Sequence, residues 1–344
     1  EEHQGDDASL AARLAILYEV ARDFGKSSYY FMIASRRAAS LFGFNEALTL
    51  ANRGLEGLEA IPDGPERKQL ELGLQLARGH GLRSVVGWSA EEIEKTYGRA
   101  QELCHELNDP PELFPVQWNL TFFSMIAGAL GWVADQLPRL RAQAEETGET
   151  AFVVAWHHVA GVSAEFRGDV VEAHRLLERG RELHPPDEHE RYSAMFGIDP
   201  GMIARCMSSR PMWTLGHVDR ALERARETVA LGRSQNQPTT LVFALVVQQG
   251  IHLYRGEAEE ALAMGDEILA LCGEYGLAHE GHWAKSFSGG ALMISGRPEE
   301  GAELLQKALD ELKRLRSGLV RPTFLALLGE AHARCGRVEE GLAA

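Results

Sequence analysis

Apolar residues in the second half of this chain recur with helical spacing, and short polar turns that begin with Gly separate the apolar stretches. Four of these turns start at Gly216, Gly256, Gly296 and Gly336, at steps of 40 residues, and an acidic residue follows within the next few positions. Gly suits a left-handed residue at a helix end, and acidic side chains suit the first turn of a helix. The pattern therefore predicts a repeated unit of helix, tight turn and helix.

The same spacing extends towards the N-terminus with one interruption. Gly128 lies 40 residues before Gly168, whereas Gly168 lies 48 residues before Gly216, which indicates one insertion of eight residues. From Gly168 onwards, a small residue follows each Gly by five positions, where we expect the second helix of a pair to cross the first closely. These small residues are Ala173, Ala221, Ala261, Gly301 and Gly341.

The first half follows the pattern more loosely. Residues 44–48 are expected to open a second helix, and Pro65 and Pro110-Pro111 to open first helices, where proline is favoured. No segment alternates Val, Ile and Thr at strand length, so sheet content should be near zero. We predict an all-α, right-handed superhelical solenoid of about eight antiparallel helix pairs, with a period of about 40. We expect one repeat array over residues 1–344, with an insertion loop at 184–201.

Charge and cysteine content narrow the function classes. The chain has 35 Lys and Arg against 50 Asp and Glu, a net charge of −15, which disfavours nucleic acid and an anionic membrane surface as partners. Its four cysteines show no CxxC spacing, as expected in a reducing cytoplasm. The longest apolar stretch, residues 152–162, is too short to cross a bilayer. The chain begins Glu1-Glu2 without Met, and we expect it to be a piece of a longer protein.

One repeat carries a recognisable motif. Leu328-Gly329, followed by His332, Gly336 and the small residue at 341, resembles the tetratricopeptide motif except at His332, where an aromatic residue is usual. HEAT repeats are the alternative, because their period of about 40 to 47 is closer than the 34 of the usual tetratricopeptide repeat. The small residue five positions after each Gly favours the tetratricopeptide type.

Six further segments resemble the tetratricopeptide region of large bacterial signalling proteins of the STAND ATPase type. They are Glu56-Gly57-Leu58-Glu59-Ala60-Ile61-Pro62-Asp63, Pro65-Glu66-Arg67, Glu91-Glu92-Ile93-Glu94-Lys95-Thr96-Tyr97, Arg99-Ala100-Gln101-Glu102-Leu103-Cys104, Pro111-Glu112-Leu113-Phe114-Pro115-Val116 and Gly197-Ile198-Asp199-Pro200-Gly201. In such proteins an ATPase and a cyclase-homology or kinase domain perform the chemistry, and the repeats are believed to sense a ligand or partner. The resemblance thus implies a cytoplasmic, non-catalytic sensor or scaffold.

Alignment of the first helices by their Gly residues predicts a concave groove. Aromatic, His and charged side chains on such a wall suit capture of a protein, a peptide or a small effector. The alternative is ordinary core packing, which is the more frequent role of an aromatic residue on a helix. The predicted groove residues are Trp118, Phe122, Met125, His158, Glu165, Arg210, Trp213 and Trp283.

The insertion is a second candidate site, because an irregular segment in a repeat array often borders its binding face. Within 184–201 we single out His189, Tyr192 and Asp199. The alternative is that the prolines there only stop and restart helices. Pro211 next to it either bends the following first helix or marks where that helix starts.

No residue pattern indicates a metal site, a cofactor or a catalytic group. His157-His158 and His279-Glu280-Gly281-His282 lack the helical i, i+4 spacing of zinc hydrolases. Two alternatives to a binding module remain: a helical enzyme with its site at 184–201, and a purely self-associating array. Contact with the ATPase or output domain of a parent protein is a further possible partnership.

Overall fold

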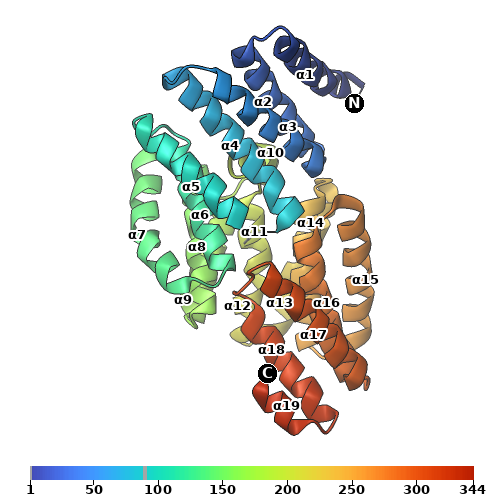
Figure 1. Cartoon of the computed structure of the whole chain (residues 1–344). Coiled ribbons are helices and arrows are strands. Elements are labelled where there is room, and N and C mark those ends of the chain that lie inside the picture. Colours follow the sequence, from blue (N-terminus) through green and yellow to red (C-terminus); the bar gives the residue numbers. More distant parts are fainter. Residues whose placement is uncertain (1, 88–90) are drawn as a thin grey trace. The chain divides into compact units, whose positions relative to one another are not determined.

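The computed structural model describes residues 2–87 and 91–344, which are almost entirely helical (Figure 1). No strand occurs among these residues, as the sequence predicted. The described chain forms two compact units, of which the first ends at Leu120 and the second begins at Thr121. The boundary falls inside helix α6, and each unit is described separately below.

Unit 1 contains alternating antiparallel helices and one short 3-10 turn. Its elements are α1 (Glu2–Val20), α2 (Phe24–Ser40), α3 (Phe44–Gly57), η1 (Leu58–Ala60), α4 (Pro65–Val86), α5 (Glu91–Glu106) and the first part of α6 (Leu113–Ile126).

Close helix contacts hold unit 1 together. The buried Ser28 hydroxyl on α2 donates to the Gly54 carbonyl on α3 at 2.8 Å. A Cβ atom at Gly54 would lie 2.5 Å from Leu74 of α4, so only glycine lets these helices approach so closely. Phe31 fills the space beside them and is almost fully buried.

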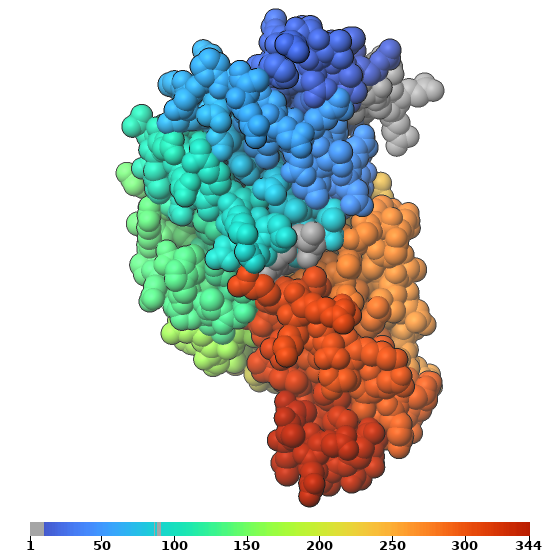
Figure 2. Space-filling model, in the orientation of Figure 1, coloured from blue at the N-terminus to red at the C-terminus, as the bar shows by residue number. Residues whose placement is uncertain are grey.

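Unit 2 continues the alternation from the end of α6, and its orange and red C-terminal helices form a continuous surface in the space-filling view (Figure 2). Its remaining elements are α7 (Leu130–Thr147), α8 (Thr150–Phe166), α9 (Val170–Leu183), η2 (Pro186–Glu188), α10 (His189–Phe196), α11 (Pro200–Met207), α12 (Ser209–Thr214), α13 (Val218–Ser234), α14 (Pro238–Tyr254), α15 (Ala258–Tyr275), α16 (Ala278–Ile294), α17 (Pro298–Arg314), α18 (Arg321–Arg334) and α19 (Val338–Ala343).

As expected, consecutive helices pack against each other in the pairs α2–α3, α4–α5, α8–α9, α11/α12–α13, α14–α15, α16–α17 and α18–α19. All six glycines expected at the turns have positive φ, between 75° and 92°, which confirms the turn positions. Each is followed two residues later by the first residue of a helix. The glycines are Gly128, Gly168, Gly216, Gly256, Gly296 and Gly336.

The small residues after these turns lie where paired helices touch. Ala173, Ala221 and Ala261 are fully buried. At Gly301 on α17, an added Cβ atom would lie 2.6 Å from the carbonyl oxygen of Gly289 on α16. A larger side chain would therefore separate the two helices, which is the reason for the small residue in the repeat.

The inserted segment differs from the expected loop. Residues 186–196 form η2 and α10, so the segment 184–201 is mostly helical. Pro211 lies inside the next first helix, which is interrupted just before it, rather than starting that helix. The proline ring conflicts with the carbonyl four residues earlier, and α11 ends at that residue, Met207, before α12 continues at Ser209.

Candidate functional site

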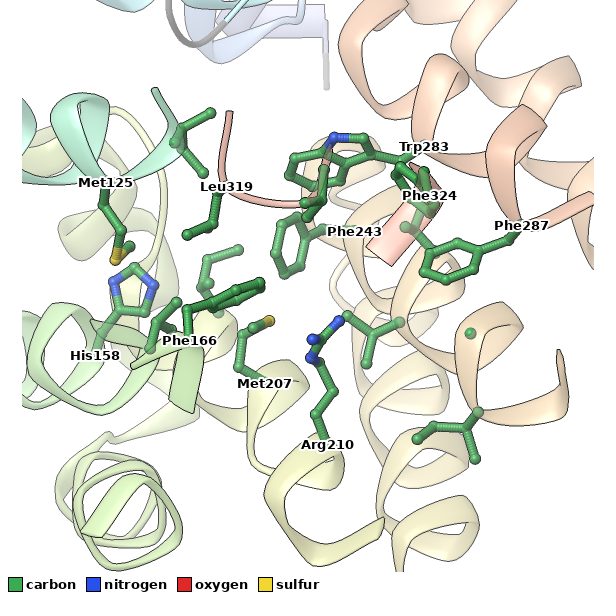
Figure 3. A pocket seen from close by; sticks show the side chains of 18 of the residues that line it. Met125, His158, Phe166, Met207, Arg210, Phe243, Trp283, Phe287, Leu319 and Phe324 are labelled. Carbon is green, nitrogen blue, oxygen red and sulfur yellow. The ribbon is translucent and has the colours of Figure 1, made fainter. Parts of the chain in front are cut away.

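First helices of successive pairs in unit 2 surround an apolar cavity of about 50 Å³. Helices α6, α8, α11, α12, α14, α16 and α18 each contribute lining side chains, and Leu319 and Val320 add the loop between α17 and α18. Figure 3 shows these side chains converging from both sides, with Leu319 reaching in from the loop.

Aromatic rings in contact with one another make up much of the wall. Phe243 of α14 packs against the edge of Trp283 of α16, with ring centres 5.9 Å apart. The ring centre of Phe287 lies 5.0 Å from that of Phe324 on α18 (Figure 3). It lies 6.5 Å from the ring centre of Tyr254. Edge-on contacts of this kind are favoured by the charge distribution of the rings, so the wall is a connected aromatic cluster.

One charged pair lies at the cavity. Nε of Arg210 on α12 donates to Oε1 of Glu165 on α8 at 2.6 Å. The guanidinium also lies 5.0 Å from the centre of the Phe166 ring. Burial alone would lower the pKa of Arg210, but the neighbouring Glu165 carboxylate leaves that pKa raised above its ordinary value. The cavity therefore contains a cation whose charge is already balanced.

His158 of α8 contributes a neutral ring. The residue is fully buried, and its ring centre lies 5.1 Å from that of Phe122. Burial lowers the pKa of His158 to about 3, so the imidazole carries no charge at neutral pH. Figure 3 shows the Met125 side chain beside this imidazole. Together these residues form an uncharged end of the cavity.

The structure brings together some of the predicted groove residues. Phe122, Met125, His158, Arg210 and Trp283 all line the cavity. Glu165 lies beside it as the partner of Arg210.

Two predicted groove residues lie elsewhere. Trp118 is fully buried and does not line the cavity, so it presents no surface to a ligand. It belongs to the part of α6 that lies in unit 1. Trp213 is half-buried and packs against Tyr254, with ring centres 6.0 Å apart, behind the cavity wall. The Gly-based alignment identified the correct helices but not the face of every side chain.

Several lining residues that sequence reasoning missed lie at the 40-residue step from the predicted Trp283 or one helical turn from it. Ile203, Phe243 and Trp283 are spaced by 40, and so are Met207, Val247 and Phe287. The first set lies four residues before the second, one helical turn away on the same face. Comparing positions across repeats at this step would have found them.

The inserted segment contains a buried cluster around Asp199. His189 Nδ1 and His184 Nε2 lie 2.8 Å and 2.9 Å from Oδ2 of the fully buried Asp199. Its Oδ1 accepts the backbone N–H groups of Gly201 and Met202 and so caps α11. Burial would raise the pKa of Asp199, but the two histidines lower it below its usual range.

The three residues singled out in this segment are used in packing. Tyr192 is fully buried, and its ring contacts the edge of His184 at 5.0 Å. Ser193 Oγ lies 3.4 Å from Nε2 of His189, which gives the order of a Ser-His-Asp triad. Ser193 lies inside α10, however, where backbone N–H groups serve the helix rather than an oxyanion. Helix capping and packing account for the whole cluster.

The described residues offer neither a metal site nor a membrane span. Within 2–87 and 91–344, no group of three or more His, Cys, Asp or Glu side chains is arranged to hold a metal ion. No helix in the same ranges combines the length and apolar character needed to span a bilayer.

Comparison with known proteins identifies the fold. No protein family model and no curated protein match the sequence. Among solved structures, aspartyl phosphate phosphatase F of Bacillus subtilis is 12% identical with a TM-score of 0.56, covering 98% of this chain and 92% of the other. A Rap protein complexed with competence and sporulation factor is 10% identical with a TM-score of 0.53, covering 92% and 99%.

A third structure is a signal transduction ATPase with numerous domains (STAND) from Pyrococcus horikoshii, which carries a tetratricopeptide repeat sensor. It is 10% identical with a TM-score of 0.50, and the match covers 98% of this chain and 52% of that one. The chain thus spans about half the length of that STAND protein. These similarities confirm an all-helical, tetratricopeptide-like repeat fold rather than a HEAT array.

Proposed function

We propose that this chain is a binding module and that the cavity of unit 2 is its ligand site. The observation that carries the proposal is the convergence of seven helices on one apolar cavity that contains a balanced ion pair. Ligand sites in proteins are concave and mostly apolar, with a few placed polar groups. The module recognises an effector and performs no catalysis itself.

The wider context of the module is a second part of the proposal. The sensor named in the Pyrococcus horikoshii protein and the factor bound to the Rap protein fit a sensing role. We infer that the chain is the cytoplasmic sensor region of a larger bacterial signalling protein of the STAND type. The enzyme alternative at 184–201 is weaker, because His189, Tyr192 and Asp199 are buried and engaged in packing.

A cavity-filling variant tests the proposal. A ligand that binds only the folded chain raises its melting temperature. Fractions of a bacterial metabolite extract should therefore shift the melting of the wild-type chain but not of Val246→Phe, which fills the cavity from α14. Val171→Phe is the matched control, because Val171 is exposed on α9. Equal shifts in Val246→Phe and the wild type, or no shift with any fraction, would remove the cavity as the site.

A further inference from the structure

The loop between α17 and α18 makes a contact that repeat packing does not require. The backbone N–H groups of Gly318 and Leu319 both donate to the carbonyl oxygen of Ile126, at 2.9 Å and 3.0 Å. Ile126 is the last residue of α6, 192 positions before Gly318. Repeats in a solenoid ordinarily contact only their neighbours, so this contact joins the two ends of the helix series around the cavity. We call residues 315–320 the clasp.

The residue types in the clasp fit this contact closely. A Cβ atom at Gly318 would lie 2.2 Å from the carbonyl oxygen of Ala127, so glycine alone allows the approach. The next residues, Leu319 and Val320, line the cavity. On the other side, Ser317 is fully buried, and its hydroxyl lies 3.3 Å from Nε2 of His279 on α16. The clasp is thus both a wall of the cavity and a link between α6 and α16.

We propose that the clasp is the gate of the cavity and that the ligand it admits is a compact, uncharged, apolar molecule. This inference rests on the proposed function, because it assumes that the cavity is a ligand site. Opening the gate requires release of the two backbone hydrogen bonds to Ile126, of the Ser317–His279 contact and of the two apolar side chains, a local event compared with unfolding.

The charge of the lining excludes an ionic ligand. Arg210 is already paired with Glu165, and the opposite end contains a fully buried His158. An added anion would compete with Glu165, and an added cation would lie beside Arg210, so either would be buried without a free partner. Burying an unpaired charge is strongly unfavourable.

The size of the cavity excludes a peptide under the closed clasp. Its volume of about 50 Å³ is about a third of the roughly 150 Å³ of an apolar cavity that takes up benzene or xenon. Met125 and Met207 lie in the wall, and flexible methionine side chains can move to enlarge the space. A molecule the size of benzene or fluorobenzene therefore fits only when these methionine side chains move.

Fluorine NMR with the full chain tests both parts of the inference. Fluorobenzene is the apolar probe and 4-fluorobenzoate the anionic one. We expect fluorobenzene to bind the wild type in slow exchange and 4-fluorobenzoate to bind at least tenfold more weakly. In Gly318→Ala, the added methyl group pushes the clasp away from Ala127, so fluorobenzene should exchange at least tenfold faster than in the wild type. Gly273→Ala is the matched control, because a Cβ atom there meets no neighbour within 4 Å.

A second variant covers the case in which Gly318→Ala fails to fold. Ser317→Ala removes the contact with His279 without adding atoms, and it should accelerate fluorobenzene exchange in the same direction. Hydrogen exchange at the Gly318 and Leu319 amides should slow at saturating fluorobenzene, because a ligand in the closed cavity stabilises the clasp.

The outcomes separate this inference from the proposed function. Absence of fluorobenzene binding, or equal binding of 4-fluorobenzoate, overturns the ligand class. Equal exchange rates in the wild type and the clasp variants overturn the gate. If an extract fraction still shifts the wild type but not Val246→Phe, the cavity remains a ligand site and only the class or gate is wrong. If neither the melting experiment nor the fluorine NMR gives the expected result, the cavity is not a ligand site.

Discussion

Arg210 on α12 and Glu165 on α8 form an ion pair across the cavity wall, 45 positions apart, with Nε and Oε1 at 2.6 Å. Their side chains are 20% and 9% exposed, so solvent screens the pair only slightly. Aligning the first helices of the repeats by their Gly residues predicted both residues in the groove, as separate candidates. Their pairing means that substituting one alone leaves an uncompensated charge beside an apolar cavity.

The first prediction concerns this pair. Arg210→Met and Glu165→Gln should each destabilise the chain, with Arg210→Met near the lower end of the roughly 3–5 kcal/mol range for a broken buried pair. The double variant Arg210→Met/Glu165→Gln should lose less stability than the two single losses added together. Urea unfolding of the four proteins gives the coupling. Additive losses would show that the two charges do not stabilise each other.

A second prediction uses the close helix crossing. Ala261 is fully buried at the start of α15, and its carbonyl accepts from Gln249 of α14 at 3.0 Å. Ala261→Leu should overpack this contact and cost roughly 1–3 kcal/mol. Ala221→Leu should do the same at the equivalent position. Glu259→Gln on the exposed first turn is the control, and losses of similar size at Glu259 and Ala261 would contradict the assigned crossing.

The turns and crossings could be predicted because they depend on local constraints that every repeat shares. A left-handed residue at a helix end favours glycine wherever it occurs, so the 40-residue step revealed Gly216 and its equivalents. The clasp could not be found in this way. Gly318 is required by Ala127, a partner from a different repeat, and nothing in the residues around 318 indicates which carbonyl they meet.

The candidate site was predicted in part for a similar reason. Helical alignment identifies which helices face inward, but a side chain's final contacts depend on the neighbouring helix. His158 and Trp283 therefore lie in the cavity, whereas Trp118 is enclosed in the core. The inserted segment was recognised by its length, yet its helix α10 depends on the buried contact between His189 and Asp199, which only the folded chain shows.

The burial of Trp118 leads to a third prediction. Because this indole has no exposed surface, Trp118→Ala should destabilise the chain by roughly 3–5 kcal/mol through loss of packing. A residue that only contacted a ligand would instead weaken binding and leave folding stability unchanged. Trp132→Ala on α7 is the matched control, since Trp132 is 45% exposed. Thermal unfolding followed by circular dichroism distinguishes the two. A Trp118→Ala protein that melts like the control would place Trp118 at a surface.

The cluster in the inserted segment gives a fourth prediction. Asp199→Ala removes the cap of α11, worth about 0.5–2 kcal/mol, and leaves two buried imidazoles without their acceptor, at about 1–3 kcal/mol each. Added together, these terms predict a loss of roughly 2.5–8 kcal/mol in urea unfolding. Asp169→Ala is the control, because Asp169 only caps α9, accepting from the N–H of Glu172 at 3.2 Å. If both variants lose the same amount, the histidines do not depend on Asp199.

The last prediction concerns pH. Burial lowers the pKa of His158 to about 3 in the folded chain, against about 6.5 in an unfolded one. Between these values the unfolded chain binds a proton that the folded chain does not, so the free energy of unfolding falls as the pH falls. One such group contributes up to about 1.4 kcal/mol per pH unit. His80 and His279, whose pKa values burial also lowers to about 3, add to the same slope.

Urea unfolding between pH 6.5 and 5.0 isolates this effect, because carboxylates titrate mainly below that window. His158→Leu replaces the imidazole with an apolar side chain and removes the contribution of one histidine to the pH dependence. Between pH 6.5 and 5.0, the free energy of unfolding should therefore fall by about 2 kcal/mol less in this variant than in the wild type. His217→Gln, at an exposed position at the start of α13, is the control for replacing a histidine. If His158→Leu keeps the wild-type slope, the imidazole at the cavity takes up a proton in the folded chain. The lining would then be open to an anionic ligand, contrary to the ligand class inferred above.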